Sequence, residues 1–178
     1  MTYKSISDVI QDLEQSGDLR RFLPKSRKPP RRRLFLAKPA MKDFDDLSSA
    51  TNLLVGQGFI RSSLDRWTLG ERVHSDGKMG RFLKDLEPPP PEIWELRVTE
   101  PIVQGRLIGR FAEPDTLILS KFYTRSFLGK KGSPEWNWAL QQCDALWASL
   151  FQGLPLFVGT TIHNYVTENC DDFPIKKK

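Results

Sequence analysis

The fold is decided by residues 93–123, which read IWELRVTEPIVQGRLIGRFAEPDTLILSKFY. In 93–98 and again in 106–112, side chains alternate with a period of two between an apolar face and a face that carries charge. This period is typical of strands that bury one face. After turn-forming residues at 113–115, a strongly apolar third strand is predicted at 116–123. Three successive strands with short connections predict an antiparallel meander.

A long helix is predicted directly after the meander. Ser133 is a good N-cap, Pro134 suits the first helical position, and Glu135 interacts favourably with the helix dipole. Apolar residues then recur at helical spacing: Trp136, Ala139, Leu140, Cys143, Leu146, Trp147 and Leu150. Such a stripe is more often core than a ligand pocket, so it predicts a helix packed on the sheet.

The elements before the meander have weaker signals. Residues 33–37 read as a strand, and Pro39 opens a helix that is expected to end at Gly56 and Gly58. A further helix is predicted around residues 78–86. The period of the pattern then changes from helical to extended at the meander, which predicts the α+β class.

The ends of the chain add a helix and a strand. Residues 6–16 have apolar positions on one helical face, and 155–165 are expected to form a last strand. The predicted organisation is an N-terminal helix and arm over 1–32, one α+β domain over 33–175, and a basic tail over 176–178. The helix is too short to be stable alone, so it must dock on this chain, a second copy or a partner.

Positive charge is concentrated in the arm. The chain has 27 basic and 22 acidic residues; eight of the basic ones lie in 19–33 and three in 176–178, which leaves 16 basic residues against the 22 acidic ones. A basic segment with three prolines is expected to be exposed and extended. It either binds a polyanion, with release of counterions, or is a solvated linker. Its candidate nucleic-acid-binding residues are Arg20, Arg21, Lys25, Arg27, Lys28, Arg31, Arg32 and Arg33.

The sequence offers no pattern for a cofactor or a metal. Cys143 and Cys170 are far apart, and His74 and His163 do not supply zinc-ligand spacing. The uncharged stretch 145–167 is broken by glycine and proline, which argues against a membrane span. No secretion signal is visible, so we expect reduced cysteines and a cytoplasmic location.

Arginines on the predicted strands are the candidate chemistry. In the alternation, Arg97, Arg106 and Arg110 share the polar face of adjacent strands. Lys121, Tyr123 and Arg125 lie toward the end of the next strand. Such arginines grip phosphates in a metal-free ribonuclease, where lysine or tyrosine transfers protons. The alternative is that they form ordinary ion pairs with nearby acids; these are Glu92, Glu95, Glu100 and Glu113.

A family resemblance bears on this choice. The motifs that carry it are Glu95-Leu96-Arg97, Arg110-Phe111, Asp115, the apolar Leu117–Phe122, Arg125 with Lys130-Lys131, and Pro134 with Ala139. In this order, residues 92–142 resemble the second half of the RelE/HigB-like toxin superfamily in its phage-derived branch. The chain departs from the family where Tyr123-Thr124-Arg125 replaces a pair of lysines.

The resemblance implies a fold and a function. The fold would be a small twisted antiparallel sheet of about four or five strands packed by helices. The activity would be cleavage of messenger RNA, held in check by a small antitoxin protein. By position, Arg97 and Arg110 would face the phosphate, with Lys121, Tyr123 and Arg125 as further catalytic candidates, while Arg106, Lys130 and Lys131 would bind RNA. The alternatives are nucleic-acid binding without catalysis through 19–33, or protein interaction through the helix at 6–16.

Overall fold

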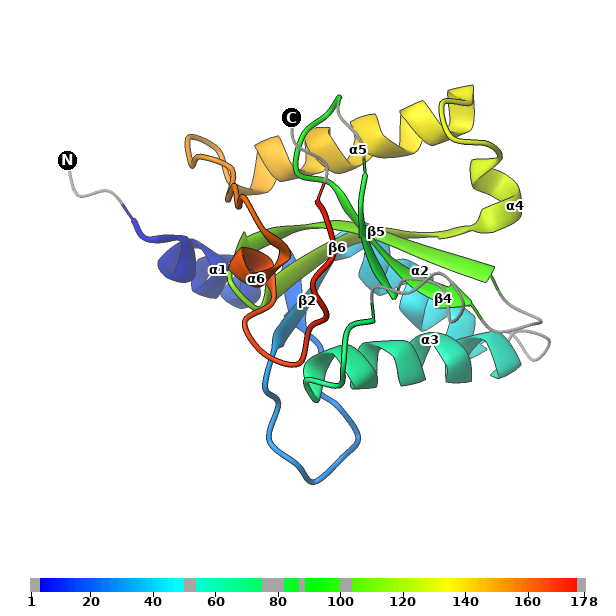
Figure 1. The fold of residues 1–178 in the computed structure, drawn as a ribbon, viewed down its shortest axis with the longest axis horizontal. Helices are drawn as coiled ribbons and strands as arrows, with labels where there is room; N and C mark the ends of the chain where they lie inside the picture. Colours follow the sequence, from blue (N-terminus) through cyan, green and yellow to red (C-terminus); the bar gives the residue numbers. More distant parts are fainter. Residues whose placement is uncertain (1–3, 50–53, 75–81, 87–88, 100–103, 176–178) are drawn as a thin grey trace.

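The computed structural model describes residues 4–49, 54–74, 82–86, 89–99 and 104–175. They form one curved sheet with helices against both faces (Figure 1). In the described residues the sheet has six strands in the order β1-β2-β6-β5-β4-β3. The strands are β1 (Leu19–Arg21), β2 (Arg33–Ala37), β3 (Leu83–Asp85), β4 (Trp94–Thr99), β5 (Gln104–Glu113) and β6 (Thr116–Thr124). The predicted α+β class is confirmed.

The meander of β4, β5 and β6 is confirmed, with antiparallel pairing throughout. Leu107 and Phe111 of β5 lie in the main core, together with Leu96 of β4. A register shift separates Ile108 from Gly109. At Gly109 a Cβ atom would come within 2.1 Å of the carbonyl oxygen of Ile118, so only glycine fits this close approach of two strands.

The predicted sheet of four or five antiparallel strands is wrong in two respects. β2 pairs with β6 in parallel, with Leu34 beside Leu117 and Leu36 beside Leu119. The strands β1 and β3 extend the sheet at its two ends. Both are three residues long, too short for a period of two to stand out from the sequence.

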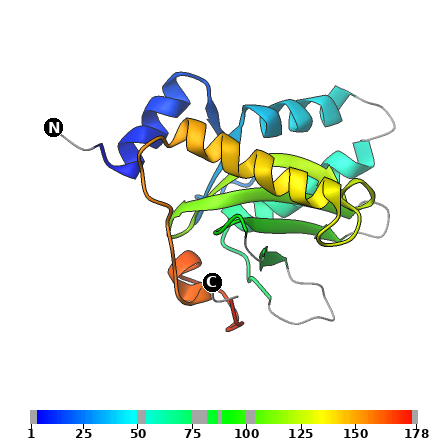
Figure 2. The same ribbon diagram turned by 90° about the horizontal axis from the view of Figure 1, so that it is seen from above.

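Helices cover both faces of the sheet, as the view from above shows (Figure 2). They are α1 (Ile6–Gln15), α2 (Lys38–Ser49), α3 (Leu54–Thr68), α4 (Arg125–Leu128), α5 (Pro134–Leu150) and α6 (Ile162–Tyr165). The core on the α3 side includes Leu64 and Trp67, whereas Trp136 and Leu140 of α5 pack with Ile108 on the other side. The prediction for α5 is confirmed, including the N-cap Ser133. No helix in the described ranges is long and apolar enough to cross a membrane.

Three predicted elements differ in the structure. Gly56 and Gly58 lie inside α3 instead of ending a helix, because the buried face of α3 outweighs the cost of about 1 kcal/mol for each glycine. The helix expected around 78–86 is wrong at 83–85, which form β3; residues 78–81 lie outside the described part. The strand expected at 155–165 is wrong, since its last four residues form α6 and the others form no strand.

The N-terminal helix docks on its own chain. Ile10 of α1 is buried with Leu19, Phe35 and Trp147, and its neighbours on the apolar face pack against the same cluster. β1 then pairs with β2, so the segment after α1 belongs to the sheet. The apolar face of α1 is therefore covered by the chain itself, which removes the evidence for docking in trans.

Candidate nucleic-acid interface

Beyond Leu119, one edge of β6 has no neighbouring strand, and α2 lies beside it instead. β2 pairs with β6 only up to Leu119, and the chain then turns into α2. Asp43 of α2 accepts a hydrogen bond from the backbone N–H of Phe122 at 3.1 Å and from Nζ of Lys121 at 3.0 Å. Asp43 thus satisfies a backbone donor that no strand reaches. It also holds Lys121 in an ion pair, which weakens that residue as a candidate proton-transfer group.

Two of the predicted strand arginines lie side by side. Arg97 of β4 is directly opposite Arg106 of β5, and the buried carboxylate of Glu95 lies between them. Oε1 of Glu95 is 2.6 Å from Arg97, and Oε2 is 3.4 Å from Nε of Arg106. The expected ion pairing is therefore confirmed at these positions. Because one carboxylate serves two guanidinium groups, the pair keeps a net positive charge and has N–H donors left for a ligand.

A third guanidinium group adds to this charge. The pKa of Arg106 is lowered, mainly by burial, and the positive charges of Arg97 and Arg125 lower it further while Glu95 opposes them. Arg125 opens α4 and donates a hydrogen bond to the carbonyl of Gly129. The loop that follows α4 carries the exposed Lys130 and Lys131. Positive charge is thus concentrated where β6 ends.

Three aromatic rings adjoin the arginines. Tyr123 of β6 is directly opposite Arg106. Its ring is stacked with Phe127 of α4 at 5.7 Å between centroids, and Trp138 of α5 meets both rings edge-on. Phe127 and Trp138 are 48% and 45% exposed, which is unusual for such large apolar side chains. We call this set the arginine–aromatic surface; it comprises Arg97, Arg106, Tyr123, Arg125, Phe127 and Trp138.

A hollow of about 470 Å³ borders the aromatic rings. It lies between the start of α2, the free half of β6 and α5, and Tyr123 and Trp138 form part of its wall. The Tyr123 hydroxyl is buried and has no hydrogen-bond partner. Burial, with smaller effects of Cys143 and Asp43, raises the pKa of Tyr123 to about 12. The phenol therefore stays protonated at neutral pH and acts as a donor.

Arg110 does not belong to this surface. Its side chain is 2% exposed, and its guanidinium group donates hydrogen bonds to Asp144 of α5 at 2.6 Å and to the carbonyl of Pro91 at 2.8 Å. It also lies 5.9 Å from the ring centre of Trp147. Arg110 thus joins β5 to α5 inside the fold. The structure does not bring it together with Arg97 and Arg106 as a phosphate-facing residue.

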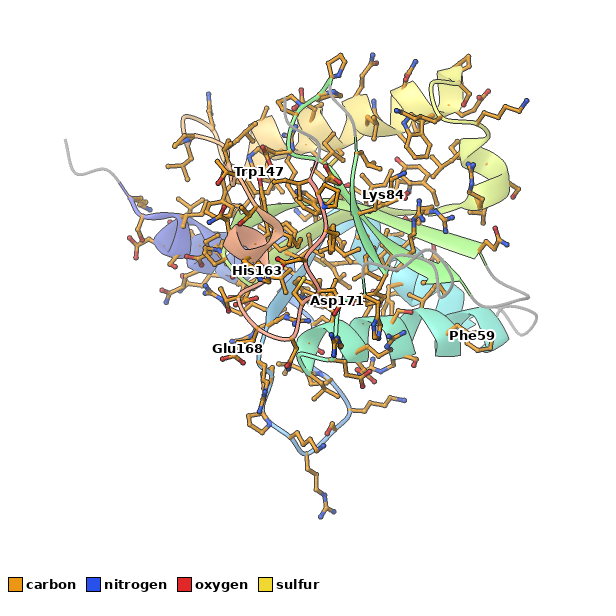
Figure 3. All side chains as sticks on the ribbon, in the orientation of Figure 1. Phe59, Lys84, Trp147, His163, Glu168 and Asp171 are labelled. Atoms are coloured by element: carbon orange, nitrogen blue, oxygen red, sulfur yellow. The ribbon has the colours of Figure 1, made fainter. Side chains whose placement is uncertain are left out.

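The basic segment 19–33 is divided by the fold. Its ends are held by the protein: Arg20 pairs with Asp45, Arg31 with Glu168 beside the stem of the loop (Figure 3), and Arg33 with Glu113. Arg32 is buried and donates to two backbone carbonyl groups, of Glu71 and Glu168. These contacts leave Arg21 exposed on β1.

Residues 22–30 form a loop that projects from the molecule, and we call it the basic loop (Figure 1). Lys25, Arg27 and Lys28 are exposed on it, and this part agrees with the expected exposed arm. Arg61 of α3 holds the loop by donating to the carbonyl of Leu23 at 3.1 Å. The basic loop therefore lies on the α3 side of the sheet, whereas α5 and the arginine–aromatic surface lie on the other side.

Phe127 and Trp138 were not predicted from the sequence as site residues. Trp138 lies outside the apolar stripe of α5, and that position was the available signal, because a tryptophan on the polar face of an amphipathic helix has no core to enter. Comparison of the chain with protein-family models and with curated protein sequences finds no match in either. In the described residues, no group of three acidic, histidine or cysteine side chains is placed to hold a metal ion.

Proposed function

We propose that the chain binds single-stranded RNA through the arginine–aromatic surface, as an RNA-associated protein of the RelE-like type. The observation that supports this most directly is the exposed ring of Phe127, which is stacked on the buried ring of Tyr123 beside the paired arginines. Unpaired bases stack on aromatic side chains, and this stacking tolerates any base. Duplex nucleic acid keeps its bases stacked on one another and cannot use the rings in this way.

The arginines would supply the contacts to the backbone. Guanidinium groups bind phosphate oxygens in a fork, and Arg97 and Arg106 are neighbours on adjacent strands. Glu95 fixes both side chains, which reduces the entropy lost when a phosphate binds. Lys130 and Lys131 would extend the positive charge along the strand of RNA.

The order of elements supports the RelE-like part of the proposal. The segment with the resemblance forms β4, β5, β6 and the proline-started α5, and β2 with its helices precedes it. Of the two arginines carried over as phosphate-facing, Arg97 is on the surface and Arg110 is buried. Arg106 takes the place of Arg110 in this proposal. A small antitoxin-like partner would act by covering the same surface.

RNA cleavage is a second candidate, favoured by the unpartnered hydroxyl of Tyr123 opposite Arg106. In a metal-free reaction the ribose 2′-hydroxyl loses its proton to water while its oxygen attacks the phosphorus, the bond to the 5′-oxygen breaks, and a proton reaches the leaving oxygen. Tyr123 would donate that proton, and Arg97 and Arg106 would stabilise the charge on phosphorus. The products would be a 2′,3′-cyclic phosphate and a free 5′-hydroxyl group.

Removal of the exposed rings tests the proposal. Stacking contributes about 1–3 kcal/mol per base, so Phe127→Ala and Trp138→Ala should each weaken binding of a labelled single-stranded uridine oligomer about 5- to 100-fold. Fluorescence anisotropy at low salt measures the affinity. The same RNA, run on a denaturing gel after incubation with wild type and Tyr123→Phe, reveals cleavage and its dependence on the hydroxyl.

Val158→Ala is the control, because Val158 is another exposed apolar residue in a segment far from α4. It should leave RNA affinity unchanged, and all variants should keep the wild-type melting curve. Unchanged affinity in both ring variants would refute the proposed surface. Loss of binding only when Lys25, Arg27 and Lys28 are replaced would favour the basic loop instead.

A further inference from the structure

The hollow of about 470 Å³ beside the arginine–aromatic surface has the size of a small-ligand site. Pro39 at the start of α2, together with Ala145 and Leu146 of α5, gives it apolar walls. Ser120 of β6 and Gln142 of α5 add polar groups to the lining. A flat ring with polar groups on its edge, such as a nucleobase, suits walls of this kind.

The hydroxyl of Tyr123 is an independent indication of a ligand. Tyr123 lines the hollow and is 7% exposed, and its hydroxyl has no hydrogen-bond partner among the described residues. Burial raises the pKa of Tyr123 to about 12, and Cys143 of α5 and Asp43 of α2 act in the same direction. The hydroxyl therefore lies between the two helices that flank the hollow. A buried donor without an acceptor is costly, and a ligand oxygen in the hollow would satisfy it.

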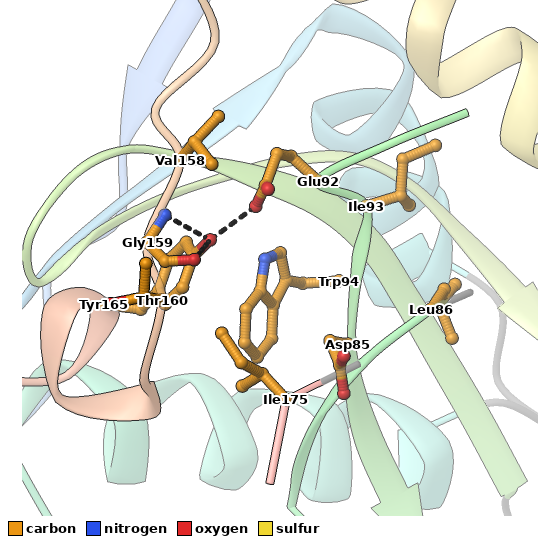
Figure 4. A pocket seen from close by; sticks show the side chains of 10 residues that line it. All are labelled: Asp85, Leu86, Glu92, Ile93, Trp94, Val158, Gly159, Thr160, Tyr165 and Ile175. Carbon is orange, nitrogen blue, oxygen red and sulfur yellow. Dashed lines mark hydrogen bonds between the residues drawn. The ribbon is translucent and has the colours of Figure 1, made fainter. Parts of the chain in front are cut away.

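A buried tyrosine also lines a second hollow, of about 270 Å³ (Figure 4). There the hydroxyl of Tyr165 donates to Oε2 of Glu92 at 2.6 Å and accepts from the backbone N–H of Gly159, also at 2.6 Å. Groups of the protein thus satisfy Tyr165, whereas Tyr123 lacks such a partner in the described part of the chain. Of these two hollows, the one beside α5 is the better candidate for a ligand that accepts a hydrogen bond.

Trp138 connects this hollow to the arginine–aromatic surface. Its ring lines the hollow, and the centroid of the ring is 6.2 Å from that of Phe127. One base of a single strand can therefore stack on Phe127 while a neighbouring base enters the hollow. Stacking accepts any base, so a preference between bases must come from hydrogen bonds inside the hollow.

We propose that the hollow receives one base of the bound RNA and selects a base whose inner end carries a carbonyl oxygen, as uracil does; this rests on the RNA binding proposed above. In uracil, C4 lies opposite the nitrogen that carries the ribose, so O4 enters first and accepts the hydrogen bond from Tyr123. Cytosine has the same size but an amino group at C4, which leaves the proton of the hydroxyl without an acceptor. In this assignment Tyr123 binds the base, which is an alternative to its role in cleavage.

Fluorescence anisotropy with the full chain tests this selection, by comparing labelled uridine and cytidine oligomers of equal length. Wild type should bind the uridine oligomer about tenfold more tightly, because one hydrogen bond distinguishes the two bases. Tyr123→Phe keeps the ring and removes the hydroxyl, so the two affinities should become equal. Equal affinities in wild type, with both weakened by Phe127→Ala, would overturn the base selection and leave the proposed function intact. Absence of binding to either RNA would overturn both.

A blocking variant locates the base. Ala145 is exposed on α5 and lines the hollow, so the added ring of Ala145→Phe should occupy the hollow and remove the preference for uridine. Ala148→Phe is the matched control, because Ala148 is exposed on the same helix outside this lining, and it should keep the wild-type preference. If Tyr123→Phe fails to fold, this pair decides the question. A preference for uridine that persists in folded Ala145→Phe would contradict the assignment.

Discussion

At the scale of single residues, the buried carboxylate of Glu95 determines how the site arginines are held. It is fully buried and contacts both Arg97, whose side chain is 22% exposed, and Arg106, which is buried with 8% of its surface exposed. A buried carboxylate is stable only when cations compensate it, and clustered guanidinium groups need an anion for the same reason. Glu95 therefore stabilises the arginine pair and, under the proposed function, reduces the positive charge available to RNA.

Glu95→Gln should separate these two effects. The change leaves the guanidinium groups of Arg97 and Arg106 without their shared anion, so the free energy of unfolding should fall by about 3 kcal/mol. One more net positive charge at the surface should tighten RNA binding about fivefold at low salt. Urea denaturation measures the first effect and fluorescence anisotropy the second.

Glu113→Gln is the matched control. Glu113 also forms an ion pair, with Arg33, but it lies at the end of β5 that is away from Arg106. It should not change RNA affinity. Weaker RNA binding by Glu95→Gln, in protein shown to be folded, would mean that Glu95 itself contacts the ligand or that RNA binds elsewhere.

The sequence predicts part of this site and cannot predict the rest. The period of two places Arg97 and Arg106 on one face, and the structure adds that they are in direct register. Arg110 obeys the same period and is nevertheless buried, because α5 covers this part of the face and supplies Asp144. The alternation of residues predicts the face of a strand on which a side chain lies. It does not predict which other element of the fold covers that side chain.

At the scale of elements, the junction between α4 and α5 holds two of the three aromatic rings. Ser133 accepts the backbone N–H of Trp136 as N-cap of α5, and its hydroxyl donates to the carbonyl of Leu128 at the end of α4. One side chain thus joins the start of the helix that carries Trp138 to the end of the helix that carries Phe127.

Ser133→Ala should reduce the free energy of unfolding by about 1–2 kcal/mol, because an N-cap and a second, partly buried hydrogen bond are lost together. Ser149→Ala is the control in the same helix, since its exposed hydroxyl bonds only the carbonyl of Leu146 in its own last turn. That change should stay within about 0.5 kcal/mol of wild type. Equal effects of the two substitutions in chemical denaturation would show that Ser133 has no special role.

Elements with several local signals were predicted well. α5 has a cap, a proline and a long stripe, and β4 to β6 have period and turn residues. The failures depend on contacts distant in sequence. β3 forms because β4 offers an edge, and α6 forms where Tyr165 meets Glu92. The parallel insertion of β2 beside β6 joins segments about 80 residues apart, which no local pattern encodes.

At the scale of the whole molecule, positive charge lies in two separate places. The basic loop is held by α3, whereas the arginine–aromatic surface is built from β4 to β6 and the helices that follow. The sequence predicts the loop as a cationic segment, because charged residues can be read from a sequence. It does not show which aromatic rings are exposed. Within the described residues, the second place combines cations with the exposed rings of Phe127 and Trp138, and the proposed RNA binding rests on this combination.

Ultraviolet cross-linking of the wild-type chain to single-stranded uridine RNA tests this assignment most directly, because it needs no substitution. After proteolysis, mass spectrometry identifies the peptides that carry a cross-linked nucleotide. We expect adducts in residues 122–138, at Phe127 or Trp138, and their disappearance in a Phe127→Ala, Trp138→Ala double variant. Adducts confined to the basic loop at 22–30, with none in 122–138, would contradict it.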